Sequence, residues 1–201
     1  LFVAAQNGHN NIVKLLINNG VNINKAVAQK KFTPLGIAVM REHYNVVKTL
    51  CTNNGINIDL AESNGNSPLH IASQKHNIMI MEELLKNGSN INLPKPDGCT
   101  ALWIASSKGD LETVKLLIQY GAKIDLSDLQ GATPLFVASQ NGKRDVVNYL
   151  IKNGANINMA REVDGTNLVM IAASRGHYDI VLKLLNLGIK IDNLNKLGMS
   201  V

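Results

Sequence analysis

Residues 130–139 read Gln-Gly-Ala-Thr-Pro-Leu-Phe-Val-Ala-Ser, and variants of this stretch recur along the whole chain. Its leading apolar residue, Leu135, stands three residues before Ala138, and the same spacing returns every 33 or 34 residues. The six pairs are Leu1 and Ala4, Leu35 and Ala38, Leu69 and Ala72, Leu102 and Ala105, Leu135 and Ala138, and Val169 and Ala172. A fixed period of this length indicates one small repeat copied in tandem, with neighbouring repeats sharing a continuous core.

Two helices are predicted in each repeat. A good N-cap residue precedes the first helix in five repeats, namely Thr33, Ser67, Thr100, Thr133 and Asn167. A proline follows three of them, at the first helical position where its missing N–H costs nothing. A glycine that can take a positive φ ends this helix, as at Gly109 and Gly142, whereas Glu42 and His76 replace it in two repeats. A second helix with an apolar stripe such as Val147, Leu150 and Ile151 follows at once.

A polar segment connects each second helix to the next repeat. It begins after a glycine such as Gly121 or Gly154 and ends at the next N-cap residue. Its composition predicts an extended loop or hairpin, which we call the finger of the repeat that follows it.

These residues carry a family resemblance. Thr33-Pro34-Leu35 with Ala38, Ser67-Pro68-Leu69-His70 with Ala72, and Thr133-Pro134-Leu135 with Ala138 resemble the ankyrin-repeat family, and the match covers essentially all residues in about six copies. The resemblance implies an all-α solenoid, in which each repeat is a helix-turn-helix with a β-hairpin or loop finger. The repeats would then be residues 1–24, 25–59, 60–92, 93–125, 126–158 and 159–192 of a single solenoid over 1–201, with 193–201 starting a further repeat. We expect the chain to be a piece of a longer array.

The composition argues against several classes of protein. The net charge of +5 is spread along the chain, so a nucleic-acid groove is not favoured, and no apolar run approaches the roughly 20 residues of a membrane span. Cys51 and Cys99 occupy non-equivalent positions in their repeats, which predicts free thiols and an intracellular, cytoplasmic location. There is no phosphate-binding loop and no grouping of Cys and His with metal-ligand spacing. We therefore expect no enzyme, no metal and no cofactor.

Large aromatic residues form the first candidate binding set. Trp103 and Phe136 follow the leading apolar residue of their repeats, and Phe32 lies in a finger. The family resemblance places first helices and fingers on a concave binding face, where aromatic anchors often dominate binding energy. The alternative interpretation is that each ring fills space between adjacent fingers.

Basic residues form the second set. Arg41, Lys75, Lys108 and Arg175 stand just before the end of the first helix in four repeats. Such a column would meet an acidic peptide or a phosphate backbone. The alternative is that the helix dipole alone favours a cation in the last turn.

Polar and acidic residues complete the candidate surface. Asp97 in a finger dilutes the positive field, which favours a mixed protein interface over a nucleic-acid groove. Gln74, Gln140 and Asn141 vary between repeats, as residues of a recognition surface should.

The leading hypothesis is a monomeric, non-catalytic scaffold that binds a partner protein or peptide, with acidic groups facing the basic column, on its concave face. The alternative is that the array is the substrate-targeting arm of a larger enzyme or effector, for example a ubiquitin ligase adaptor. Nucleic-acid binding is the least favoured of the three.

Overall fold

A computed structural model of the chain describes residues 1–27, 30–161 and 163–189. These residues form twelve α-helices and no sheet. The helices are α1 (Phe2–Gln6), α2 (Asn10–Asn18), α3 (Pro34–Met40), α4 (Tyr44–Cys51), α5 (Pro68–Lys75), α6 (Ile78–Lys86), α7 (Ala101–Lys108), α8 (Leu111–Gln119), α9 (Pro134–Gln140), α10 (Arg144–Lys152), α11 (Leu168–Ser174) and α12 (Tyr178–Asn186). Each predicted repeat contains one helix pair, while the repeat boundaries stay a prediction and residues 193–201 lie outside the described ones.

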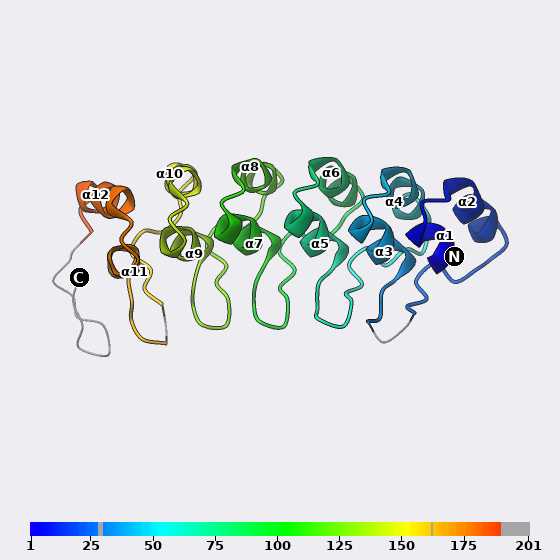
Figure 1. The fold of residues 1–201 in the computed structure, drawn as a ribbon, viewed down its shortest axis with the longest axis horizontal. Helices are drawn as coiled ribbons and strands as arrows, with labels where there is room; N and C mark the ends of the chain where they lie inside the picture. The colour runs from blue at the N-terminus through cyan, green and yellow to red at the C-terminus, as the bar shows by residue number, and fades with distance from the viewer. Residues whose placement is uncertain (28–29, 162, 190–201) are drawn as a thin grey trace. The chain divides into compact units, whose positions relative to one another are not determined.

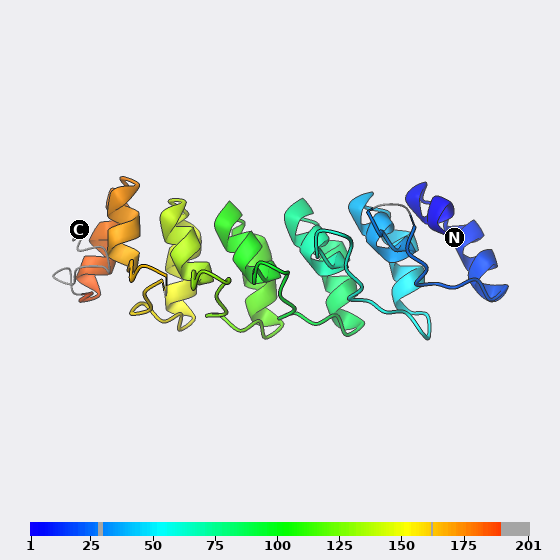
Figure 2. The same ribbon diagram turned by 90° about the horizontal axis from the view of Figure 1, so that it is seen from below.

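The helices belong to two compact parts of the chain, Leu1–Pro96 and Asp97–Val201. In each part the first helices of the repeats pack side by side in one layer and the second helices in another, with the fingers extending from the side of the first helices (Figure 1). Figure 2 views the chain from the finger side, where the helix pairs of each part lie next to one another. Most fingers are loops, and an isolated bridge joins Val27 to Phe32 among the described residues.

The predicted helix starts are confirmed. The side chain of each predicted N-cap residue accepts a hydrogen bond from the backbone N–H three residues later, as from Gly36 to Thr33 at 2.9 Å and from Phe136 to Thr133 at 3.1 Å. Ser67, Thr100 and Asn167 cap α5, α7 and α11 in the same way. The cap satisfies an N–H group that has no partner inside the helix.

A column of alanines forms the centre of the first-helix layer in each part of the chain. The side chains of Ala38, Ala72, Ala105, Ala138 and Ala172 are completely buried. A methyl side chain lets neighbouring helices approach closely, at roughly the 8 Å end of the usual range. The residue three positions earlier, a leucine in four repeats and Val169 before Ala172, is buried as well, so the repeated pair belongs to the core of each part.

Two histidines at equivalent positions tie adjacent repeats together. Nε2 of His43 donates a hydrogen bond to the carbonyl oxygen of Gln6, and Nε2 of His177 donates one to that of Gln140, both at 2.9 Å. The ring of His177 lies over Gly142, where a Cβ atom would come within 2.6 Å of it. These histidines therefore have a structural role.

The finger turns are closed by carboxylates. Asp128 Oδ1 accepts hydrogen bonds from the N–H groups of Gln130 and Ala132, both at 2.9 Å. Glu62 occupies the equivalent position in an earlier finger and accepts from the N–H groups of Asn64 and Asn66. Burial alone would raise the pKa of Glu62, but these hydrogen bonds outweigh it and hold the pKa below its usual value.

The end of the first helix requires a left-handed backbone even where glycine is absent. Glu42 has φ 61° and His76 has φ 57°, close to the 81° of Gly109. Outside glycine, this region costs an L-residue about 1 kcal/mol. The two repeats therefore keep the standard geometry and carry local strain.

That strain predicts an unusual order of stabilities. His76→Gly should have a free energy of unfolding about 1 kcal/mol higher than His76→Ala, because both remove the side chain and only alanine is strained at this φ. Lys75, inside α5, provides the matched control, where Ala should be more stable than Gly by a similar amount. Chemical denaturation measures all four variants, and an Ala variant as stable as the Gly variant at position 76 would contradict the expectation.

The turn of Glu62 predicts a pH-dependent loss of stability. Because its folded pKa is lowered, the unfolded state binds more protons, so its contribution is complete above the unfolded pKa of roughly 4.3 and is lost as the pH falls further. Glu62→Gln should therefore be less stable than the wild type at pH 7, and the difference should shrink between about pH 5 and pH 3. Denaturation at a series of pH values tests this, and a difference that does not change with pH would refute it.

Candidate functional site

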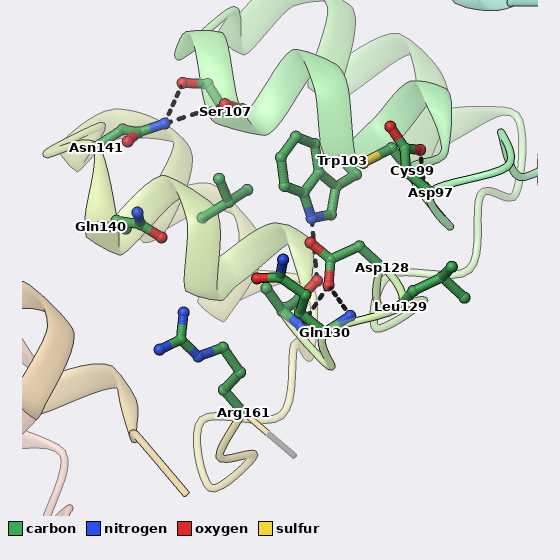
Figure 3. A pocket seen from close by; sticks show the side chains of 12 residues that line it. Asp97, Cys99, Trp103, Ser107, Asp128, Leu129, Gln130, Gln140, Asn141 and Arg161 are labelled. Atoms are coloured by element: carbon green, nitrogen blue, oxygen red, sulfur yellow. Dashed lines mark hydrogen bonds between the residues drawn. The ribbon is translucent and has the colours of Figure 1, made fainter. Parts of the chain in front are cut away.

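The second part of the chain carries an open hollow of about 620 Å³ between its first helices and fingers (Figure 3). Helices α7 and α9 form one side of it, and the turns of three successive fingers form the other. Its lining residues are Asp97, Cys99, Trp103, Ser107, Asp128, Leu129, Gln130, Ala132, Val137, Gln140, Asn141 and Arg161.

Trp103 lies at the centre of the hollow, at the third position of α7. Its indole N–H donates a hydrogen bond of 3.0 Å to the carbonyl oxygen of Ala132 in the next finger. The side chain is half-buried, so part of the ring remains accessible. The hydrogen bond holds the ring in one orientation and leaves its π surface as the group that a ligand would meet.

Phe136 has the same position in the next repeat but a different environment. Only 2 % of it is exposed, because Arg161 of the following finger lies over the ring, with the guanidinium carbon 5.5 Å from the ring centroid. The finger that follows Trp103 carries Asp128 at the position of Arg161, and Asp128 closes its own turn. A short residue in place of a long one therefore leaves Trp103 accessible.

Arg161 is held by an ion pair with Asp164 of the same finger. Hydrogen bonds from the guanidinium lower the pKa of the Asp164 carboxyl well below its usual range, although burial opposes the shift. The same pair raises the pKa of Arg161, and the charge of Asp128 adds to this effect. The positive charge of Arg161 at this edge of the hollow is thus compensated by nearby carboxylates.

The fingers and helix ends around the hollow are linked to one another. The N–H of Leu129 donates to the carbonyl oxygen of Asp97 in the preceding finger at 3.0 Å. At the far side, Nδ2 of Asn141 donates to the backbone and hydroxyl oxygens of Ser107, both at 3.0 Å. Leu129 is 78 % exposed, so this lining residue presents a large apolar side chain to solvent at the edge of the hollow.

Four predicted site residues come together at this hollow: Asp97, Trp103, Gln140 and Asn141. Phe136 does not line the hollow and is not an exposed anchor, so its ring fills space against the next finger, as in the alternative interpretation. Lys108 and Arg175 are exposed in the same part of the chain but do not line the hollow.

The other predicted residues lie in the first part, Leu1–Pro96. Phe32 is 8 % exposed and its backbone pairs with Val27, so it too is a buried residue of a finger and not an exposed anchor. Arg41 is exposed, Gln74 donates to Asn66 at 3.1 Å, and Nζ of Lys75 lies 3.7 Å from Glu42 Oε1. The predicted basic column is thus partly neutralised in this part.

Sequence reasoning missed Asp128, Leu129, Val137 and Arg161 as lining residues. Leu129 had a usable signal, because a large apolar residue inside a polar turn cannot reach the core. Arg161 and Asp128 had none, since their effect depends on which ring lies behind each of them in the fold.

Within residues 1–27, 30–161 and 163–189, no three His, Cys, Asp or Glu side chains are grouped so that they could hold a metal ion. No helix in these ranges is long and apolar enough to cross a membrane.

Comparison with known proteins agrees with the repeat pattern. The family model for ankyrin repeats (3 copies) matches residues 1–95, 79–161 and 128–195. Alpha-latrotoxin-Lhe1a of Latrodectus hesperus is 39 % identical over 72 residues, which are 36 % of this chain and 5 % of the toxin. The chain therefore matches only a small fraction of that protein's length. Ankyrin repeats are generally protein–protein interaction modules and typically act as non-catalytic scaffolds. The repeat period, the stacked helix pairs and the family match together show that this chain belongs to the ankyrin-repeat family.

Proposed function

We propose that the chain is a non-catalytic module that binds a segment of a partner protein in the hollow around Trp103. The observation that carries this proposal is that the half-buried Trp103 and the exposed Leu129 both line one open cavity of about 620 Å³. A volume of this size accommodates several side chains, and aromatic groups at its centre are the usual anchors of protein recognition.

The rigidity of the lining supports the same proposal. The orientation of Trp103 is set by its bond to Ala132, and the finger turns are closed by Asp128 and joined through Leu129 and Asp97. Preformed sites of this kind bind with little ordering cost, because their side chains are already held in place. The role is the same whether the array acts alone or as the targeting arm of a larger enzyme, since in both cases the hollow contributes binding only.

The charge around the hollow favours a protein partner over a nucleic acid. Asp97 and Asp128 face the cavity, whereas Lys108 and Arg175 stand at the ends of first helices outside it. A phosphate backbone would be repelled at the fingers, while a protein segment can present both signs of charge. We accordingly propose a mixed interface, in which acidic groups of the partner meet the helix-end cations.

A reducing, intracellular location is also part of the proposal. Cys51 and Cys99 are 5 % and 7 % exposed, and burial raises the pKa of the Cys51 thiol to about 12. A protonated, buried thiol is unreactive and suits a protein that is not held by disulfides.

Trp103 is the only tryptophan of the chain, so its fluorescence reports directly on the hollow. We expect peptides selected from a random 12-residue display library to shift its emission on binding. Leu129→Ser should weaken these peptides about tenfold through loss of apolar contact. Met79→Ser, which changes an apolar residue of α6 that is 64 % exposed, is the matched control and should change nothing. If peptides bind without changing the emission of Trp103, and bind the Leu129→Ser variant as tightly as the wild type, the binding surface lies elsewhere.

A further inference from the structure

The hollow around Trp103 has a charge opposite to that of the whole chain. The protein carries a formal charge of +5, yet two of the three charged residues that line the hollow are carboxylates, Asp97 and Asp128. The third, Arg161, is paired with Asp164. Among the lining residues, carboxylates therefore outnumber cations although the whole protein is basic, and such a local excess of negative charge can select a partner.

We infer that the hollow takes a lysine or arginine side chain of the partner, with its cation between the indole of Trp103 and the carboxylates of Asp97 and Asp128. This inference rests on the proposed function and names the chemistry of the group that is bound. It places a basic residue of the partner at the fingers. The basic column at the ends of the first helices, taken alone, would instead predict an acidic partner.

The state of Trp103 supports a cationic ligand. Its N–H is already bonded to the carbonyl oxygen of Ala132, so the indole does not need a hydrogen-bond acceptor from the partner. What the ring offers to the cavity is its π surface, and indole is the aromatic group that attracts cations most strongly. Figure 3 shows the ring on the same side of the cavity as Asp97, with Asp128 below it.

The carboxylate of Asp128 can serve the turn and a ligand at the same time. Both of its turn hydrogen bonds, from Gln130 and Ala132, go to Oδ1. Oδ2 is not needed to close the turn. A carboxylate whose position is set by two backbone N–H groups is a preorganised partner for an ammonium or guanidinium group.

The apolar lining fits the rest of a long basic side chain. Leu129 and Val137 also line the cavity, so the methylene stem of a lysine or arginine can pack on apolar surface while its charged end reaches the carboxylates. Arg161 restricts where the cation can lie, because it repels a second positive charge at the edge above Phe136.

Matched peptide libraries test the charge preference on the full chain. Three libraries of random 9-residue peptides carry lysine, N-acetyl-lysine or glutamate at the fixed central position, and binding is followed by the fluorescence of Trp103. Acetylation keeps the stem and removes the charge, so the lysine peptides should bind at least tenfold more tightly than their acetylated copies. The preference should weaken as salt is raised.

Variants of the protein test the carboxylates. Asp97→Asn and Asp128→Asn keep an oxygen that can accept the turn N–H groups but lose the charge, and each should reduce the preference for lysine by about threefold or more. Asp145→Asn, an equal loss of charge at an exposed position of α10, should leave the preference unchanged. If an Asn variant does not fold, the comparison of lysine with acetyl-lysine on the wild type still decides the matter.

The outcomes separate this inference from the proposed function. Peptides that shift Trp103 but bind equally well with lysine and acetyl-lysine, or better with glutamate, would overturn the basic ligand and leave the binding site in place. Failure of every library to affect Trp103, while peptides bind elsewhere on the chain, would overturn both.

Discussion

The buried alanine column sets the distance between neighbouring first helices, and the other contacts between repeats depend on that distance. In the second part of the chain Ala105, Ala138 and Ala172 are completely buried. Because their side chains are small, the helices approach closely. The spacing brings the N–H of Leu129 to 3.0 Å from the carbonyl oxygen of Asp97 in the fingers. A larger side chain in the column would separate the fingers as well as the helices.

At this spacing, the exposure of an aromatic ring on a first helix depends on one position in the next finger. Asp128 and Arg161 occupy equivalent places, and the N–H of each donates to a backbone carbonyl oxygen across its own turn. The side chain of Arg161 extends over Phe136, whereas that of Asp128 turns back to close its turn. The side chain at this place of the finger thus decides whether the space over the aromatic ring behind it is open or closed. This separation of scaffold from surface is how a repeat fold can present different sites.

Carboxylates and cations occupy different places on this surface because they interact with different backbone groups. Carboxylates bind the N–H groups of turns, and cations lie near the carbonyl groups at helix ends. Carboxylates such as Asp128 and Asp164 accept hydrogen bonds from the N–H groups of the finger turns. Cations such as Lys108 stand in the last turn of a first helix, where carbonyl groups carry partial negative charge. Around the hollow, the carboxylates of Asp97 and Asp128 lie in the fingers and the cation of Lys108 lies at a helix end. A partner that follows both elements would need complementary charges in the same order.

The sequence by itself determined the repeat period, the all-α architecture and the helix starts, because these depend on residues only a few positions apart. Thr133 caps α9 and His76 takes the left-handed backbone of a helix end for reasons that lie within their own repeats. Part of the candidate site was predictable in the same way, as Asp97, Trp103, Gln140 and Asn141 vary on a constant scaffold. Only the tertiary structure decided that Trp103 is accessible and Phe136 is buried. The physical reason is that the exposure of each ring is set by a side chain in the next finger, nearly one repeat further along the chain, which no local pattern reveals.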